Sequence, residues 1–243
     1  MDQWREHSSF EMKGARHLPK HSKRYNALLS RLKSEDSIPL AAAVRQLKTF
    51  NSTKFDQTVE VSTNLGIDPK QSDQNVRGAV GLPNGIGKTV RVAVFAQGEN
   101  AEKARAAGAD IVGAEDLAKQ IKDGLMNFDV ALATPDMMGL VGPLGRILGP
   151  RGLMPSPRSG TVTTDVVSAV REFKAGKIEF RNDKGGNVAA RVGKLSFSDE
   201  NLIENILAFL TYLRTLKPSA SKGVFIRSIT ISATMSPGIH VQV

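Results

Sequence analysis

Cysteine is absent from this 243-residue chain, which excludes disulfide bonds and thiolate metal sites. The four histidines lie near the chain ends, at spacings that suit neither a metal ion nor a Ser–His–Asp catalytic arrangement. Aromatic residues make up only 5%, which argues against a platform for stacking single-stranded bases. No apolar run approaches the ~20 residues of a membrane span, so we expect no membrane partner. Since no metal-binding or catalytic arrangement is present in the sequence, we also expect no cofactor.

Positive charge is in excess. The chain has 33 Lys and Arg against 24 Asp and Glu, a net charge of +9. A polyanionic partner would explain this balance, and so would solubility alone. Residues 86–176 hold 11 basic and 10 acidic side chains, so a net charge of +8 lies outside them. We therefore expect any polyanion contact mainly outside residues 86–176.

Two segments, 55–65 and 225–235, alternate like β-strands with one buried face. The second places a row of hydroxyls on one side and apolar residues on the other, with Arg227 as an exception. The hydroxyl row is Ser228, Thr230, Ser232 and Thr234; the opposite set is Phe225, Ile229, Ile231, Ala233 and Met235. Small donors and acceptors at regular spacing suit the sugar hydroxyls and phosphates of folded RNA.

The order of the predicted helices and strands indicates two units, one inserted into the other. Helices beginning near Ser22 and Ser37 precede the first strand, and a Gly- and Pro-rich stretch follows it. Between residues 90 and 176, strands alternate with helices, which is typical of a parallel α/β unit. After it we expect a strand from Lys177, a turn at 183–186, a returning strand, and an amphipathic helix over 199–216. The helix's predicted inner face is Leu202, Ile203, Ile206, Leu207, Leu210 and Leu213. The sequence therefore predicts an α/β unit inserted into an α+β unit, with a hinge at Gly85, Gly87 and Gly176.

The segment Gly85-Ile86-Gly87-Lys88-Thr89 resembles a phosphate-binding loop, but its spacing is wrong. Such a loop needs a glycine where this chain has Leu82, and it follows a strand rather than preceding one. A nucleotide-using enzyme built on the inserted unit is the alternative function, and a rise in melting temperature with ATP, GTP or NAD would favour it.

Two basic segments are candidate phosphate contacts. Residues 142–160 are rich in Gly and Pro, lack acids, and carry Arg146, Arg151 and Arg158. The run at 20–24 contains Lys20, Lys23 and Arg24. The alternatives are a proline-constrained irregular loop for the first and a solvated helix start for the second.

Six segments together resemble one family. They read PKHSKRY (19–25), KFDQTVEV (54–61), LGIDPK (65–70), SDQNVRG (72–78), LGRILGPRGLMP (144–155) and GKIEFRNDK (176–184). The chain is similar to the bacterial large-subunit ribosomal proteins conventionally numbered one, from about Pro19 to the C-terminal region. The resemblance implies a discontinuous α+β outer domain, 19–85 and 177–243, with a Rossmann-like three-layer α/β domain, 86–176, inserted into it.

The resemblance also implies a non-catalytic function. A member of this family would bind large-subunit ribosomal RNA, form the mobile stalk at the tRNA exit site, assist release of exit-site tRNA, and repress its own messenger RNA. We expect a cytoplasmic protein of the ribosome, monomeric outside it. The RNA-binding positions that carry over are Lys54, Phe55, Thr58, Glu60, Arg181, Lys184, Ser228, Thr234, Met235 and Ser236.

Three features depart from the family. Ser236 stands where the family usually has glycine, which is expected to weaken or reshape an RNA contact there. One residue, commonly basic, is missing before Leu144. Residues 1–18 have no counterpart, so they are either an extension or the product of a misplaced start, with Met12 as an internal candidate.

Overall fold

The computed structural model describes residues 21–32, 37–124 and 126–242. The fold is mixed α/β, with a four-stranded antiparallel sheet, a two-stranded antiparallel sheet and a three-stranded parallel sheet. The helices are α1 (Lys23–Leu29), α2 (Leu40–Thr49), α3 (Glu99–Ala106), α4 (Glu115–Lys122), α5 (Met138–Val141), α6 (Gly145–Leu148), α7 (Val166–Ala175) and α8 (Asp199–Thr215). The strands are β1 (Thr58–Leu65), β2 (Arg77–Gly81), β3 (Val92–Phe95), β4 (Ile111–Gly113), β5 (Val130–Ala133), β6 (Lys177–Arg181), β7 (Asn187–Lys194), β8 (Ile226–Ala233) and β9 (Ile239–Val241).

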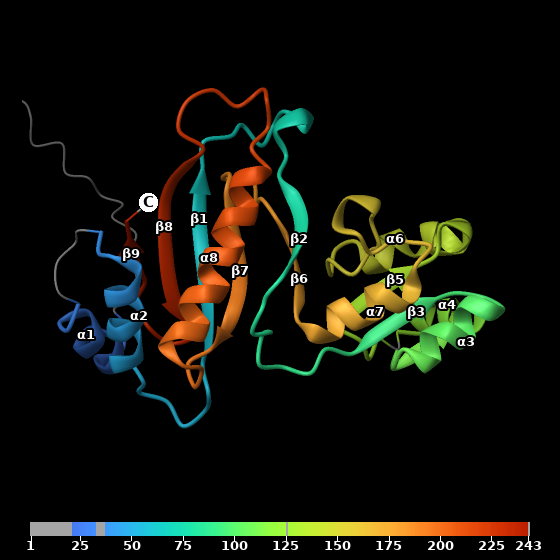
Figure 1. Cartoon of the computed structure of the whole chain (residues 1–243), viewed down its shortest axis with the longest axis horizontal. Coiled ribbons are helices and arrows are strands. Elements are labelled where there is room, and N and C mark those ends of the chain that lie inside the picture. The colour runs from blue at the N-terminus through green and yellow to red at the C-terminus, as the bar shows by residue number, and fades with distance from the viewer. Residues whose placement is uncertain (1–20, 33–36, 125, 243) are drawn as a thin grey trace, which may run out of the picture.

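The largest sheet has the order β7-β1-β8-β9, so the two predicted alternating strands, β1 and β8, are neighbours at its centre. Helices α2 and α8 pack on one face of this sheet, where α8 crosses in front of β1 and β7 (Figure 1). The odd residues of β1 from Val59 to Leu65 are buried beneath them. The alternation therefore predicts correctly which face of β1 is buried, but the predicted strand begins too early, because Phe55 lies before β1 and is 52% exposed.

Strand β8 departs from strict alternation at Arg227. Leu65 pairs with Ile226 while Asn64 pairs with Ser228, so Arg227 is an extra residue in a β-bulge. The bulge turns Arg227 to solvent and buries Ile226 in its place. The strand also ends at Ala233, so Met235 lies in a turn with 40% of its surface exposed. The prediction that Met235 belongs to the buried face was wrong.

The buried stripe of helix α8 is rotated relative to the one that the sequence predicts, with Asn205 and Phe209 buried in place of Ile203 and Leu207. Its buried residues are Leu202, Asn205, Ile206, Phe209, Leu210 and Leu213. Leu207 was wrongly placed on the inner face, because it falls outside this stripe and is 51% exposed. Its predicted place in the core is taken by Phe209, whose ring packs edge-on against Phe180 of β6.

The second sheet pairs β2 with β6. Ile178 and Phe180 are buried while Lys177, Glu179 and Arg181 face away from them, as the sequence predicts. The turn at residues 183–186 is present, and the Asp183 carboxylate accepts the Asn187 and Gly185 N–H groups, which lowers its pKa. However, the strands on either side of this turn do not form a continuous ladder among the described residues: Asn182, just after β6, makes an isolated bridge to Val188 of β7.

The parallel sheet has the order β4-β3-β5 and lies within residues 86–176. Strand β3 is wholly buried, with α7 packed against it. Residues 142–148 are not an irregular loop: two short helical turns bury Leu144 and Leu148 in this part of the core. The segment from Gly85 to Thr89 precedes β3, as expected for a connection and not for a phosphate loop.

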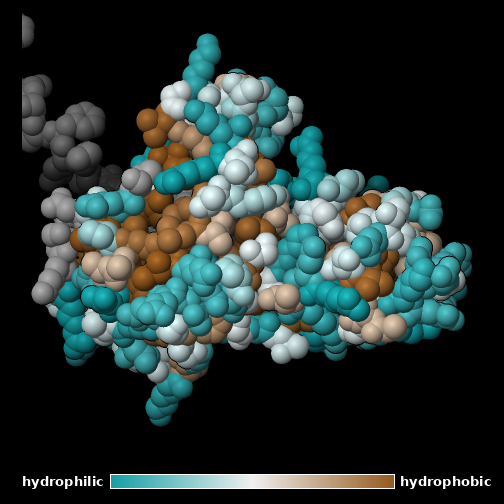
Figure 2. Space-filling view, viewed as in Figure 1, coloured by the Kyte–Doolittle hydropathy of each residue, from teal (hydrophilic) through white to brown (hydrophobic). Residues whose placement is uncertain are grey.

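The surface over the helices differs from the polar face of the sheet. Figure 2 shows apolar side chains gathered on the side where α2 and α8 lie. Leu29 and Leu207 are among the exposed large hydrophobic residues. Among the described residues, no helix has the length and apolar character needed to cross a bilayer.

Candidate nucleic-acid interface

The face of the four-stranded sheet opposite the helices is open and polar. Its members, strand by strand, are Asn187, Ala189 and Arg191 on β7; Thr58, Glu60, Ser62 and Asn64 on β1; Ser228, Thr230 and Ser232 on β8; and His240 on β9. All are exposed or partly exposed. We call this surface the open face. It carries the hydroxyl row that the sequence predicts, beside the even residues of β1.

At one end of the open face, Thr58 and Thr234 are joined. The Thr58 N–H donates to Thr234 Oγ1 at 3.1 Å, and the Thr234 N–H donates to the Thr58 carbonyl at 3.1 Å. The hydroxyl of Thr234 is therefore engaged in holding β1 to the end of β8. Lys194 Nζ donates to Thr58 Oγ1 at 2.9 Å. Since an ammonium group only donates, the Thr58 hydroxyl hydrogen is left to point elsewhere.

Sequence reasoning missed Lys194, for a physical reason. Val59 pairs with Gly193 and Glu60 with Arg191, so Val192 is an extra residue in a β-bulge of β7. Strict alternation from Arg191 would place Lys194 on the buried side, whereas the bulge returns it to the side of Thr58. No signal in the sequence marks this bulge, apart from the glycine at 193.

Gln57 positions the turn that follows β8. Its side chain is wholly buried, and its Oε1 accepts the Met235 N–H at 3.0 Å. Its Nε2 has no partner among the described residues. The apolar side chains of Phe55 and Met235 are 52% and 40% exposed. This end of the sheet thus presents two apolar side chains, and the main chain of one, Met235, is held by Gln57.

Ser236 is bonded locally. Its Oγ accepts the Ala233 N–H at 2.8 Å and lies 3.0 Å from the Pro237 carbonyl, to which it can donate. The serine therefore stabilises the turn from Ala233 to Ser236. Glycine at this position would lack both bonds.

The other predicted residues lie at the opposite end of the open face. Ser228 pairs with Asn64, six residues along β1 from Thr58, a separation of about 20 Å at strand rise. The Leu65 N–H donates to the Gly186 carbonyl, so the turn that carries Lys184 borders this end. Arg181 ends β6 and is exposed. The predicted RNA-binding residues therefore form two groups along one face.

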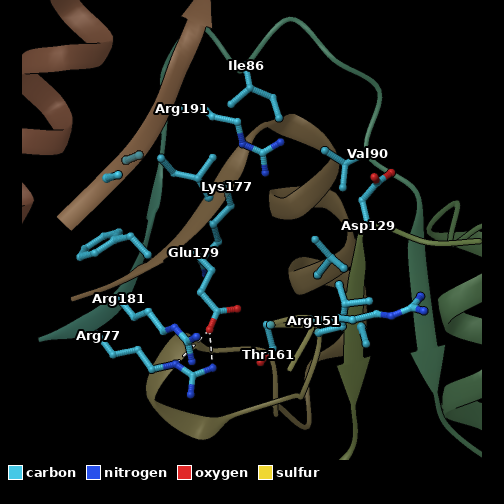
Figure 3. A pocket seen from close by; sticks show the side chains of 18 of the residues that line it. Arg77, Ile86, Val90, Asp129, Arg151, Thr161, Lys177, Glu179, Arg181 and Arg191 are labelled. Atoms are coloured by element: carbon cyan, nitrogen blue, oxygen red, sulfur yellow. Dashed lines mark hydrogen bonds and ion pairs between the residues drawn. The ribbon is translucent and has the colours of Figure 1, made fainter. Parts of the chain in front are cut away.

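A cleft of about 460 Å³ lies where the open face meets residues 86–176. Arg77, Lys177, Glu179, Arg181 and Arg191 project from the wall formed by β2, β6 and β7 (Figure 3). Arg77 is paired with Glu179, whereas the described residues include no ion-pair partner for Arg181 or Arg191. The two unpaired guanidinium groups make this wall a site of positive potential.

The remaining predicted basic residues lie apart from the open face. Arg151 lines the opposite wall of the cleft, and its guanidinium points away from Arg77 and Arg181 (Figure 3). Arg158 lies on a short helical turn that packs beside β2, and Arg146 is exposed on α6. Lys23 and Arg24 lie on α1, at the far end of the molecule from the parallel sheet (Figure 1). Lys20 and the 1–18 extension fall outside the described residues.

The two chain crossings between the sheets touch each other. Gly85 and Gly176 both have positive φ, +63° and +116°, which favours glycine. A Cβ atom on Gly176 would lie 2.5 Å from the Gly85 Cα, so only glycine permits this approach. Gly87, the third predicted hinge residue, has a φ of +68°.

Similarity to known proteins agrees with this geometry. Residues 47–237 match the family model described as the Ribosomal protein L1p/L10e family. The chain belongs to this family. It is 54% identical over 221 residues to the large ribosomal subunit protein uL1 of Thiobacillus denitrificans, covering 91% of this chain and 96% of that protein. It is 53% identical over 225 residues to uL1 of Thioalkalivibrio sulfidiphilus, covering 93% and 97%. A third uL1, from Mannheimia succiniciproducens, is 52% identical over 225 residues, covering 93% and 98%.

Family membership decides between the two functions that the sequence left open. The relatives are ribosomal proteins of the large subunit, a structural and non-enzymatic class. The chain is therefore a structural ribosomal protein, and the alternative of a nucleotide-using enzyme is set aside.

Proposed function

We propose that this ribosomal protein binds large-subunit ribosomal RNA through the open face. The observation that carries the proposal is the arrangement of β1 and β8, which aligns hydroxyl, amide and carboxylate groups over about 20 Å. A-form RNA exposes 2′-hydroxyls and base edges in a wide, shallow minor groove, which a flat polar sheet can contact. Lys54, Arg181 and Lys184 flank the face and would pair with phosphates.

From the hydrogen bonds within the protein we propose a different task for each group. The Thr58 hydroxyl, which accepts from Lys194, donates to an RNA oxygen. Glu60, an acceptor only, selects a 2′-hydroxyl or a base amino group. Thr234 and Ser236 act on the protein side, by holding the end of β8. Phe55 and Met235 supply apolar contact with a sugar or base, and Ser228 adds a hydroxyl at the far end.

The proposal includes two units joined by a hinge. Residues 19–85 and 177–243 form the outer, RNA-binding unit, and residues 86–176 form the inserted Rossmann-like unit. The parallel sheet within 86–176 and the adjacent crossings at Gly85 and Gly176 support this division. Motion of the inner unit in the ribosome would accompany release of exit-site tRNA, with Arg146, Arg151 and Arg158 as its RNA contacts.

Binding of the protein's own messenger RNA follows from the same surface. A messenger that folds into the shape of the ribosomal site would occupy the open face and block translation. We further propose that the protein is a monomer outside the ribosome.

The first experiment is a titration with the stalk fragment of large-subunit ribosomal RNA and with an unrelated hairpin, across a salt series. Contacts with phosphates alone weaken steeply as salt rises, whereas contacts with oriented hydroxyls weaken less. We expect the stalk complex to survive salt that removes the unrelated hairpin. If the two RNAs bind with equal affinity and both affinities fall equally as salt rises, the charge of +9 provides only non-specific binding of polyanions.

A further inference from the structure

One buried side chain, Asn205, holds the first chain crossing to the outer unit. Asn205 lies in α8 and has no exposed surface. Its Nδ2 donates to the Gly85 carbonyl at 3.0 Å and to the Val192 carbonyl at 2.7 Å. Its Oδ1 accepts the Asn84 N–H at 3.1 Å. One amide thus ties the crossing to both α8 and β7.

The same crossing is held to the inner unit only a few residues later. The Asp129 carboxylate, next to β5, accepts from Lys88 Nζ at 2.9 Å and from the Arg91 N–H at 3.1 Å. Between the two main-chain anchors, the Gly85 carbonyl and the Arg91 N–H, lie residues 86–90. A rotation of the inner unit must therefore be absorbed over this short segment and at the second crossing.

The second crossing rests on the residue that Asn205 holds. Gly176 packs directly on Gly85, with no room for a side chain between them. Lys177 and Glu172 form an ion pair of 2.7 Å that spans Gly176, so the second crossing is also short. Both crossings consequently share one fixed point, the Gly85 backbone.

We propose that Asn205 is a positioning residue that fixes the hinge axis to the outer unit and so sets the resting orientation of the inner unit. The inference rests on the proposed two-unit function. A buried amide is costly unless its groups are bonded, and Leu would fill this place in the stripe of α8 without that cost. Two of the three Asn205 bonds go to the crossing, which a purely local role in the core would not require.

The absence of cysteine allows a direct test by single-molecule energy transfer. Labels at Gln120→Cys on α4 and Thr211→Cys on α8 place one exposed dye on each unit. We expect Asn205→Leu to shift or broaden the distance distribution, because the fixed point is lost. Affinity for the stalk fragment should stay unchanged, since α8 lies behind the open face.

Two control variants separate this role from loss of stability. Asn84→Ala removes only the exposed contact with Glu204 and leaves the three Asn205 bonds in place, so it should keep the parent distribution. Val188→Ala opens a cavity under β7 and should lower the melting temperature without moving the distribution. Asn205→Ser, which is smaller and polar, replaces Asn205→Leu if the leucine protein does not fold.

The outcomes distinguish the inference from the function on which it rests. A folded Asn205 variant with the parent distribution overturns the positioning role. A parent protein whose dye distance is single, unchanged by the stalk fragment and unchanged in every variant overturns the two-unit hinge itself. A shift in the Asn205 variants but not in Val188→Ala supports both.

Discussion

Replacing Thr234 with valine keeps the shape of the side chain and removes the oxygen that accepts the Thr58 N–H. In the free protein Thr58 is partly exposed, so water can take the place of that oxygen. The expected loss of folding stability is therefore small, about 0.5–1 kcal/mol. RNA lying on the open face excludes this water and leaves the N–H unpaired, at a cost of about 1–3 kcal/mol. This range corresponds to about 5- to 150-fold weaker binding.

The assay is the equilibrium affinity for the stalk fragment at constant salt, with thermal melting as the check on folding. Thr234→Ser keeps the hydroxyl and should recover most of the affinity. Thr215→Val is a matched control, because its hydroxyl donates to the Tyr212 carbonyl at the end of α8, away from the open face. A Thr234→Val protein that melts like the parent and binds RNA with the parent affinity would refute the reasoning.

Two further changes test other parts of the proposed interface, and a third tests an ion pair that stabilises the fold. Lys194→Met should weaken stalk binding and lower the salt slope by about one unit if Lys194 also neutralises a phosphate; an unchanged slope and affinity would remove Lys194 from the site. Arg151→Ala should hardly change affinity for the stalk fragment, since its side chain points away from the open face, and a large loss would contradict the division of the surface. Lys88 holds the Asp129 pKa at about 2, below the unfolded value of 3.8, so Asp129 stabilises the fold above pH 4 and loses this effect as pH falls toward 2. Solvent screening limits this contribution to about 1 kcal/mol. In urea unfolding, the free energy of unfolding should fall less between pH 4 and pH 2 for Asp129→Asn than for the parent protein. An equal fall in both proteins would exclude Asp129 as the source of the pH dependence.

The sequence predicts elements well where one face is buried along their whole length. In β1 the alternation from Val59 to Leu65 matches burial, because every odd residue faces the hydrophobic core and every even residue faces away from it. It fails at Arg227 and Val192, since a bulge depends on the register of the partner strand. The alternation of residues within one strand carries no information about the register of its neighbour.

The candidate site was predicted by residue but not by arrangement. Resemblance to the family supplied Thr58, Thr234 and Ser228, while strand pairing separates Ser228 from the other two by the length of β1. The sequence did not predict the burial of Asn205, because a polar residue in an amphipathic helix ordinarily lies on its exposed face. Its burial is explained by main-chain partners distant in the sequence, the Gly85 carbonyl and the Asn84 N–H about 120 residues earlier and the Val192 carbonyl of β7.

The hydroxyl row is therefore not a uniform surface, and this changes what the proposed recognition of RNA requires. Lys194 forces the Thr58 hydroxyl to donate outward, whereas the Thr58 N–H already occupies Thr234 Oγ1. Glu60, between them and the middle of the sheet, only accepts. On β1, a donor at Thr58, which the bond from Lys194 orients, and an acceptor at Glu60 two residues away would present a fixed polarity to a bound RNA. Fixed polarity costs no reorganisation on binding, and it disfavours an RNA whose donors and acceptors lie in the opposite order.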